Sequence, residues 1–303
     1  MNYNISLLRN IALVAIILHH SLCAFGGWPP NHSIGSSLPE LMNIVSSAMK
    51  NLGLGLFTFI SGFVFYYQSR KKEGYAIFLW KKTKRLLLPC LIFAVLYMII
   101  FPSYMFDTWP SPINGTHLWY LPMLFLCIII TSLYFYSGQP LLYIVLSYII
   151  TAIIGHFSQV RTFTELTHYY PVFVLGFYSN RLKIAECISK KRTICAVAIA
   201  GLLIIWMFIP RFPFSWTIRM ACISMVSLII VTLIRQNTVI SSIQSSLSLH
   251  SYNIYLMHQF CINTLLAFTD FSSMPFYVPL TVYFLTSLIV PWGLSVAYKK
   301  FVS

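Results

Sequence analysis

Residues 9–20 read Arg-Asn-Ile-Ala-Leu-Val-Ala-Ile-Ile-Leu-His-His, which is one arginine and two histidines within a strongly apolar run. Ionisable groups are costly in hydrocarbon, so their presence there needs a functional or structural reason. On a helix, residues 11 positions apart are rotated by three whole turns plus about 20°, so Arg9 and His20 share a face and His19 points about 80° away. Arg9 and His20 are separated along the axis by about 16 Å, roughly half a bilayer. The stretch therefore predicts a membrane span with one distinctive face.

The composition of the whole chain agrees with a membrane protein. Of its 303 residues, 58% are apolar and 9% are charged, whereas soluble domains carry about 25% charged residues. Apolar runs recur at lengths near the roughly 20 residues that a helix needs to cross a bilayer. The predicted fold class is an all-α polytopic membrane protein.

The apolar runs predict a bundle of about ten transmembrane helices. They lie at about residues 5–25, 47–68, 86–101, 118–136, 140–156, a run that includes 169–176, and then 194–209, 216–234, 249–268 and 277–298. The first run lacks a small-residue cleavage site, so we expect it to be a retained span and not a signal peptide. No repeat or linker is visible, and we expect a single domain over residues 1–303.

The positive charges indicate how the bundle is oriented. The net charge of +14 would suit a nucleic-acid-binding protein, but the basic residues cluster in short segments between apolar runs, as the positive-inside rule expects. With both termini cytoplasmic, all 20 lysines and arginines except Lys50, Arg161, Arg211 and Arg219 fall on the cytoplasmic side. We therefore expect membrane lipid and no nucleic acid as a partner. In this orientation Arg9 lies at the inner surface and His20 in the outer half of the membrane.

The cysteines do not indicate a metal site or a disulfide framework. The seven cysteines lie mostly in apolar runs, without CxxC or Cys/His ligand spacing. The chain also has only six acidic residues, so no metal site is predicted.

His20 has two interpretations at this point. It is either a packing residue that hydrogen-bonds a neighbouring span, or a general base, because imidazole titrates near neutrality and can take a proton from a hydroxyl group.

Five motifs follow one another along the chain. They are Arg9 and His20 with ten residues between them, Phe-Ile-Ser-Gly-Phe at 59–63, Lys-Thr-Lys-Arg-Leu-Leu-Leu-Pro at 82–89, His-Leu-Trp-Tyr-Leu at 117–121 and Ser-Tyr-Asn-Ile-Tyr-Leu-Met-His at 251–258. In this order they resemble acyltransferase family 3, which comprises integral membrane O-acyltransferases, mostly bacterial. One departure is Lys82, which stands where the family's Arg-x-x-Arg element has its first arginine; lysine keeps the charge but loses the bidentate fork.

The resemblance implies an enzyme of the cell inner (cytoplasmic) membrane that takes an acyl group, usually acetyl, from cytoplasmic acyl-CoA and delivers it to a sugar hydroxyl at the outer side. Acetyl-CoA would be a co-substrate, with no tightly bound cofactor, and a carbohydrate would be the acceptor. Because CoA is polyanionic, Arg9, Lys82 and Arg85 are expected to bind the donor, although topology alone also explains cytoplasmic basic residues.

The same resemblance gives His20 a catalytic role, either as general base or as a transient acyl carrier. Ser61, His117 and Trp119 are candidates for binding substrate or stabilising an oxyanion. His258 is expected to bind substrate, to orient His20 or to pack. Glu165 is expected to bind a sugar hydroxyl or to pair with Arg161.

A second function of a different class stays open from the sequence. A bundle of ten spans with a polar interior also suits a transporter or flippase for a surface polysaccharide, because intramembrane histidine and arginine serve translocation as readily as catalysis. A sensor or structural role has no positive feature in the chain, and the oligomeric state is not predicted.

Overall fold

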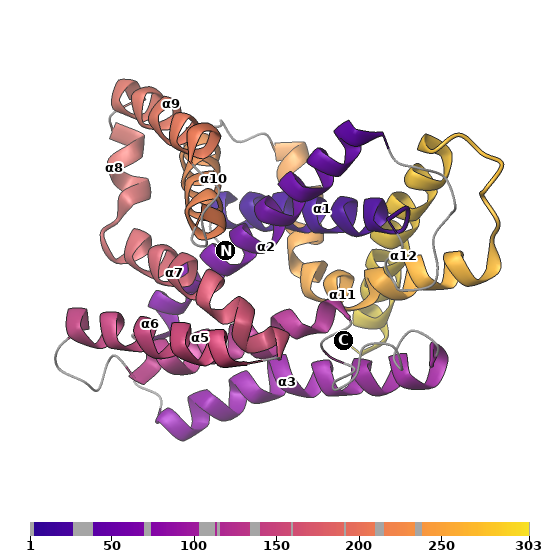
Figure 1. Cartoon of the computed structure of the whole chain (residues 1–303), viewed down its shortest axis with the longest axis horizontal. Helices are drawn as coiled ribbons and strands as arrows, with labels where there is room; N and C mark the ends of the chain where they lie inside the picture. The colour runs from indigo at the N-terminus through magenta and orange to yellow at the C-terminus, as the bar shows by residue number, and fades with distance from the viewer. Residues whose placement is uncertain are drawn as a thin grey trace. The chain divides into compact units, whose positions relative to one another are not determined.

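The computed structural model describes residues 3–26, 39–69, 74–102, 113, 116–133, 140–158, 160–190, 192–209, 215–233 and 238–302. Every regular element in these residues is a helix (Figure 1), which confirms the predicted all-α class. The chain forms two compact units. Unit 1 comprises Met1–Leu54, Val95–Thr116 and Arg235–Ser303, and unit 2 comprises Gly55–Ala94 and His117–Ile234.

Each unit has its own set of helices. Unit 1 contains α1 (Tyr3–Cys23), α11 (Thr238–Phe268), α12 (Tyr277–Val302), the first part of α2 (Glu40–Ser69) and the last part of α3 (Tyr75–Ile100). Unit 2 contains the remainder of α2 and α3 together with η1 (His117–Trp119), α5 (Tyr120–Leu133), α6 (Pro140–Phe157), α7 (Arg161–Arg181), α8 (Ile184–Lys190), α9 (Arg192–Phe208) and α10 (Ser215–Leu233).

Several helices could span a membrane. Within the residues that the structure describes, five are long and apolar enough to do so, namely α1, α2, α3, α10 and α12. Shorter apolar helices cover His117–Leu133, Leu142–Phe157 and Cys195–Phe208. These helices agree with a polytopic membrane protein, while the total of about ten spans and the orientation of the termini stay predictions. Helices α7 and α11 belong to neither group, and both carry buried polar side chains.

Three helices begin well before the apolar runs that predicted them. Helix α2 begins at Glu40, not near residue 47; α3 begins at Tyr75, not near 86; and α11 begins at Thr238, not near 249. The expectation that Lys81, Lys82, Lys84 and Arg85 lie in a loop is therefore wrong, because they are helical. Pro89 likewise lies inside α3. Hydrophobicity marks the apolar part of a helix, whereas the helix itself continues through polar residues of good helix propensity.

In unit 1, α1 and α11 run in the same direction and in register. The Ser6 hydroxyl contacts the carbonyl oxygen of Gln244, and 14 residues further along both helices His20 contacts His258. Both pairs are 238 positions apart in the chain. At 1.5 Å per residue, the two helices are thus matched over about 21 Å. Helix α12 lies beside α11 (Figure 1) and also packs on α1.

In unit 2, α2 and α7 approach backbone to backbone at two glycines. A Cβ atom on Gly62 would lie 1.9 Å from the carbonyl oxygen of Phe173, and one on Gly176 would lie 2.0 Å from that of Phe59. Both distances are too short for any side chain, so only glycine permits this crossing. The glycine of the motif at 59–63 therefore has a packing role in this unit.

Candidate active site

His20 lies in α1 with 7% of its surface exposed. Its Nδ1 atom is 2.9 Å from Oε1 of Gln259 and 3.1 Å from Nε2 of His258, both on α11. The two imidazole rings have centroids 4.9 Å apart and are tilted by 47°. The structure therefore brings together the two histidines that the first and last motifs of the sequence contain.

The α11 partners of His20 are held by further hydrogen bonds. His258 Nδ1 donates to the carbonyl oxygen of Tyr255 at 2.6 Å, and Gln259 Nε2 donates to Oδ1 of Asn263 at 2.9 Å. His258, Gln259 and Asn263 are 0%, 2% and 3% exposed. Buried polar groups of this kind destabilise a fold unless they are hydrogen-bonded. We refer to His20, His258, Gln259 and Asn263 as the histidine cluster.

Sequence reasoning identified His258 but missed two members of this cluster. Gln259 follows His258 directly, and Asn263 comes one turn later, so the two amides lie on one helical face. Two amides at this spacing within an apolar run were the signal that could have found them.

His19 contacts a different helix from His20. Its Nδ1 atom is 3.0 Å from the carbonyl oxygen and 2.9 Å from the hydroxyl of Ser46 on α2, and the Cys23 sulfur is 3.6 Å from its Nε2 atom. Helical phase predicted that the two adjacent histidines point in different directions, and they do contact different helices.

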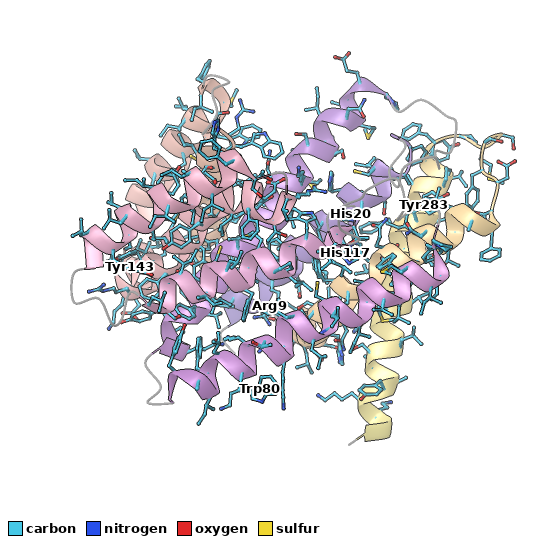
Figure 2. All side chains as sticks on the ribbon, turned by 60° about the horizontal axis from the view of Figure 1, so that its bottom comes forward. Arg9, His20, Trp80, His117, Tyr143 and Tyr283 are labelled. Atoms are coloured by element: carbon cyan, nitrogen blue, oxygen red, sulfur yellow. The ribbon has the colours of Figure 1, made fainter. Side chains whose placement is uncertain are left out.

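Arg9 lies near the start of α1, whereas His20 lies near the end of the same helix (Figure 2). It is partly buried, and the rise of the helix separates the two residues by about 16 Å. Next to it, the Asn10 amide donates to the carbonyl oxygen of Gln244 at 2.8 Å, which fixes this end of α1 against α11. Arg9 and His20 are therefore at opposite ends of the matched α1–α11 contact.

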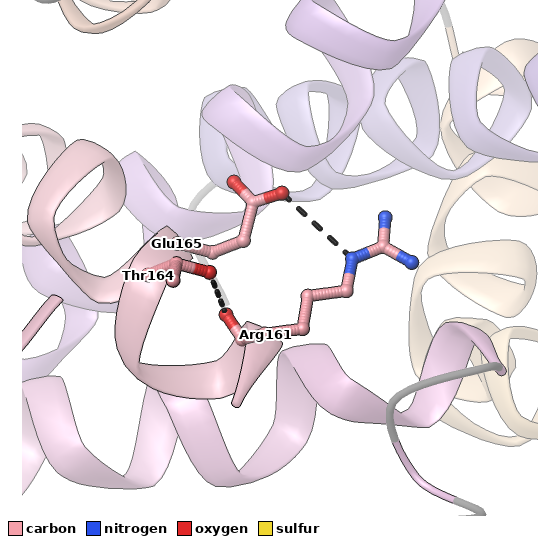
Figure 3. Close-up of polar contacts among 3 residues, drawn as sticks. All are labelled: Arg161, Thr164 and Glu165. Carbon is pink, nitrogen blue, oxygen red and sulfur yellow. Dashed lines mark hydrogen bonds and ion pairs between the residues drawn. The ribbon is translucent and has the colours of Figure 1, made fainter. Parts of the chain in front are cut away.

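In unit 2, Arg161 joins two other predicted site residues. Its guanidinium carbon lies 4.6 Å from the ring centroid of Trp119, and its Nε atom lies 3.8 Å from Oε1 of Glu165 (Figure 3). Pairing with Arg161 was one of the two roles expected of Glu165. Two turns along α7, the Tyr169 ring lies 5.8 Å from that of Trp119. Among the described residues, Glu165 Oε2 and the Tyr169 hydroxyl are buried without a hydrogen-bond partner.

His117 and Ser61 also belong to unit 2. His117 is 3% exposed in the short helix η1, which leads into α5. The Ser61 hydroxyl donates to the carbonyl oxygen of Phe57, one turn earlier in α2. Near both, Thr58 and Tyr120 are joined by a hydrogen bond of 3.0 Å between their hydroxyls, which links α2 to α5.

The predicted donor-binding residues Lys82 and Arg85 lie about one turn apart on α3. Lys82 Nζ donates a hydrogen bond to Oε1 of Gln68 and lies 5.5 Å from the centroid of the Phe78 ring. Arg85 is exposed. Lys82 is thus held against α2 and its own helix, and Arg85 is the more exposed of the two.

The predicted site residues therefore fall into two sets. Arg9, His20 and His258 belong to unit 1, and Ser61, Lys82, Arg85, His117, Trp119 and Glu165 belong to unit 2. Within unit 1, His20 and His258 are in contact; within unit 2, Trp119 and Glu165 share Arg161.

The histidine cluster has the properties of a proton-transfer site. An imidazole can accept a proton near neutral pH, and fixing one ring nitrogen by hydrogen bonds orients the other. Burial excludes bulk water, which strengthens electrostatic interactions at the ring.

A family model described as "Acyltransferase domain" matches residues 2–296, which is essentially the whole chain and includes both units. The protein therefore belongs to this acyltransferase family, as the order of the motifs predicted. It is a multi-pass membrane acyltransferase. No curated protein and no solved structure matches the chain.

Proposed function

We propose that the protein is an O-acetyltransferase of the cell inner membrane. It moves an acetyl group from cytoplasmic acetyl-CoA to a sugar hydroxyl of a cell-envelope glycan or its lipid-linked precursor. One observation carries the proposal: in a chain that belongs to an acyltransferase family, His20 is a buried imidazole whose Nδ1 atom is engaged by two side chains of α11. This is the environment that a general base requires.

In direct transfer, Nε2 of His20 removes the proton of the acceptor hydroxyl while that oxygen attacks the thioester carbonyl of acetyl-CoA. The carbon–oxygen bond forms, the carbon–sulfur bond breaks, and the CoA thiolate receives the proton from His20. Alternatively, Nε2 itself attacks the thioester carbonyl, the carbon–sulfur bond breaks and CoA leaves as the thiolate. The acceptor hydroxyl then displaces the acetyl group from Nε2, and its proton neutralises the thiolate. Both routes use the same nitrogen.

The donor and acceptor ends of the reaction use different residues. Arg9, Lys82 and Arg85 supply positive charge for polyanionic CoA at the cytoplasmic side. Trp119 and Glu165, with Arg161 between them, offer the aromatic ring and the carboxylate that suit a carbohydrate. Ser61 and His117 are candidates for stabilising the oxyanion.

The proposed topology has about ten membrane-spanning helices, with both termini in the cytoplasm. The parallel arrangement of α1 and α11 supports it. These helices correspond to the first and ninth predicted spans, and two odd-numbered spans of an alternating bundle run in the same direction.

The decisive experiment compares glycan acetylation and glycan export in cells that carry His20→Ala. General-base catalysis contributes about 10²- to 10⁴-fold, so acetylation should fall by at least that factor while export continues. Mass spectrometry of the glycan would show the loss of one acetyl increment. His156→Ala is the control, because His156 is exposed at the end of α6 and should leave acetylation unchanged.

Two results would contradict the proposal. If His20→Ala stopped export of a glycan that carries no acetyl group, the transporter function would be correct instead. If acetylation stayed normal, the role of His20 would be wrong. Incubating the purified protein with radiolabelled acetyl-CoA separates the two routes, because an acyl-histidine retains label that hydroxylamine releases.

A further inference from the structure

The donor and the acceptor of each hydrogen bond in the histidine cluster follow from its outermost partners, the carbonyl oxygen of Tyr255 and the side chain of Asn263. The carbonyl oxygen of Tyr255 can only accept, so Nδ1 of His258 carries the hydrogen of their 2.6 Å bond. Neutral His258 then has a lone pair on Nε2, the atom that lies 3.1 Å from Nδ1 of His20. Nδ1 of His20 is therefore the donor in that contact.

Gln259, the other partner of His20, also requires that Nδ1 of His20 is the donor. Gln259 Nε2 donates to Oδ1 of Asn263 at 2.9 Å, which leaves Oε1 directed at His20. An amide oxygen can only accept. The hydrogen on His20 Nδ1 is therefore shared between an amide oxygen and an imidazole nitrogen, both neutral acceptors.

We propose that His258, Gln259 and Asn263 are positioning residues that hold His20 in its Nδ1–H tautomer, so that Nε2 carries the reactive lone pair, and that His258 and Gln259 act as neutral acceptors for the imidazolium that forms during transfer. The role of the lone pair rests on the proposed function, whereas the tautomer does not. In the His–Asp pairs of hydrolases a carboxylate has this position.

The titratable groups of the helices around His20 bear on how its protonation is set. In the described part of unit 1, these groups include His19 and Cys23 on α1 itself and Lys50 on α2. They also include His258, Tyr255 and Cys261 on α11, Tyr283 on α12 and Tyr97 on α3, which interacts with Tyr255 and Cys261. The described acidic residues of this unit are Glu40, the first residue of α2, and Asp270, which follows α11.

The tautomer can be measured without any enzymatic assay. In lipid bilayers, ¹⁵N-histidine NMR on the full chain should show a pyrrole-type signal at Nδ1 and a pyridine-type signal at Nε2 of His20, assigned by their loss in His20→Gln. A pyridine-type signal at Nδ1 would overturn the proposal. Because this readout needs no substrate, it stands even if the protein proves to have no acetyltransferase activity.

The pH dependence of transfer tests the role of neutral acceptors. In Gln259→Glu, a carboxylate next to Nδ1–H favours imidazolium, so the acidic limb of the pH–rate profile should move up by about 1–3 pH units. Asn253→Asp is the matched control, because it places a carboxylate on the same helix against Ser295 of α12. An unchanged limb in Gln259→Glu, or an equal shift in the control, would contradict the proposed charge stabilisation.

The activity of variants at position 258 tests whether His258 orients His20 or only fills space. His258→Phe keeps a ring but loses the acceptor, and misorientation of His20 should lower kcat by about 10²-fold with little change in KM for acetyl-CoA. His258→Gln offers an amide oxygen as acceptor and should recover part of that loss. If both variants had the same kcat, His258 would have only a packing role.

Discussion

A histidine in a membrane helix can bind a ligand, move a proton or fill space, and its hydrogen-bond partners decide among these roles. His19 and His20 illustrate this, because they are adjacent in sequence and contact different helices. His19 bonds Ser46 on α2, whereas His20 bonds two side chains of α11. The partners of His20 are themselves fixed by hydrogen bonds to Tyr255 and Asn263, and such second-layer contacts orient an imidazole.

At the same scale, the exposed Arg85 should contribute to donor binding. A hydrogen bond to a charged group is worth about 1.5–3 kcal/mol, so Arg85→Ala should raise KM for acetyl-CoA by about 10- to 100-fold. Lys84→Ala is the control, because Lys84 is exposed on the same turn and its ammonium lies 4.9 Å from the Trp80 ring. Steady-state kinetics on the purified protein would measure both. Equal effects in the two variants would indicate a general charge effect and no specific contact.

The pair of Arg161 and Glu165 gives a prediction about stability. Arg161→Gln removes the partner of a carboxylate whose other oxygen is already unpartnered among the described residues, and this should cost about 1–3 kcal/mol. Thermal unfolding in detergent should show a lower Tm. Adding Glu165→Gln to that variant should restore part of the loss, because it removes the unpaired charge. A double variant less stable than Arg161→Gln would show that the carboxylate is stabilised by something other than Arg161.

Several features of the candidate site could be predicted from sequence, and the reasons are local. Helical phase alone separated His19 from His20, and the spacing of Arg161 and Glu165 allowed their pairing. The contact between His20 and His258 could not be derived in this way, because 238 positions separate them and no periodicity relates two distant helices. The direction of the hydrogen bonds in the histidine cluster requires the atoms themselves.

At the scale of helices, apolar runs located the elements but misjudged where they begin. Helices α2, α3 and α11 each extend through polar turns that a hydropathy argument assigns to loops. The last example is instructive, because the early turns of α11 carry the buried polar residues Gln244 and Ser248, and the carbonyl oxygen of Gln244 accepts a hydrogen bond from Asn10 of α1. Polar residues on a long membrane helix thus can mark contacts inside the protein as well as an end of the span.

The α2–α7 crossing gives the sharpest prediction at this scale. Gly62→Ala and Gly176→Ala each place a methyl group about 2 Å from a backbone carbonyl oxygen, and the strain should cost at least about 2–3 kcal/mol. Gly201→Ala is the control, since a Cβ atom there meets nothing within 4 Å and helix propensity improves by about 1 kcal/mol. Fluorescence-detected size-exclusion chromatography should show loss of monodisperse protein for the first two variants only. A well-folded Gly62→Ala variant would mean that α2 and α7 are further apart than described.

For the whole molecule, the proposed orientation predicts the location of both termini and of one loop. A fluorescent protein fused after residue 303 should fold and fluoresce, whereas alkaline phosphatase fused there should be inactive. Alkaline phosphatase inserted at residue 113, between the third and fourth predicted spans, should be active, because that segment is expected outside. The reverse pattern would invert the proposed sides for donor and acceptor.

The long-range register of α1 and α11 has a consequence for biosynthesis. Because His20 and His258 are 238 positions apart and ribosomes add about 5–20 residues per second, α1 is made roughly 12 to 48 s before its partner. Throughout that interval the imidazole of His20 and the amide of Asn10 lack the helix to which they later bond. The nascent chain must keep α1 next to the insertion machinery or other polar groups until α11 has been made. A chain truncated before α11 would leave these groups in lipid, where membrane proteases can recognise it.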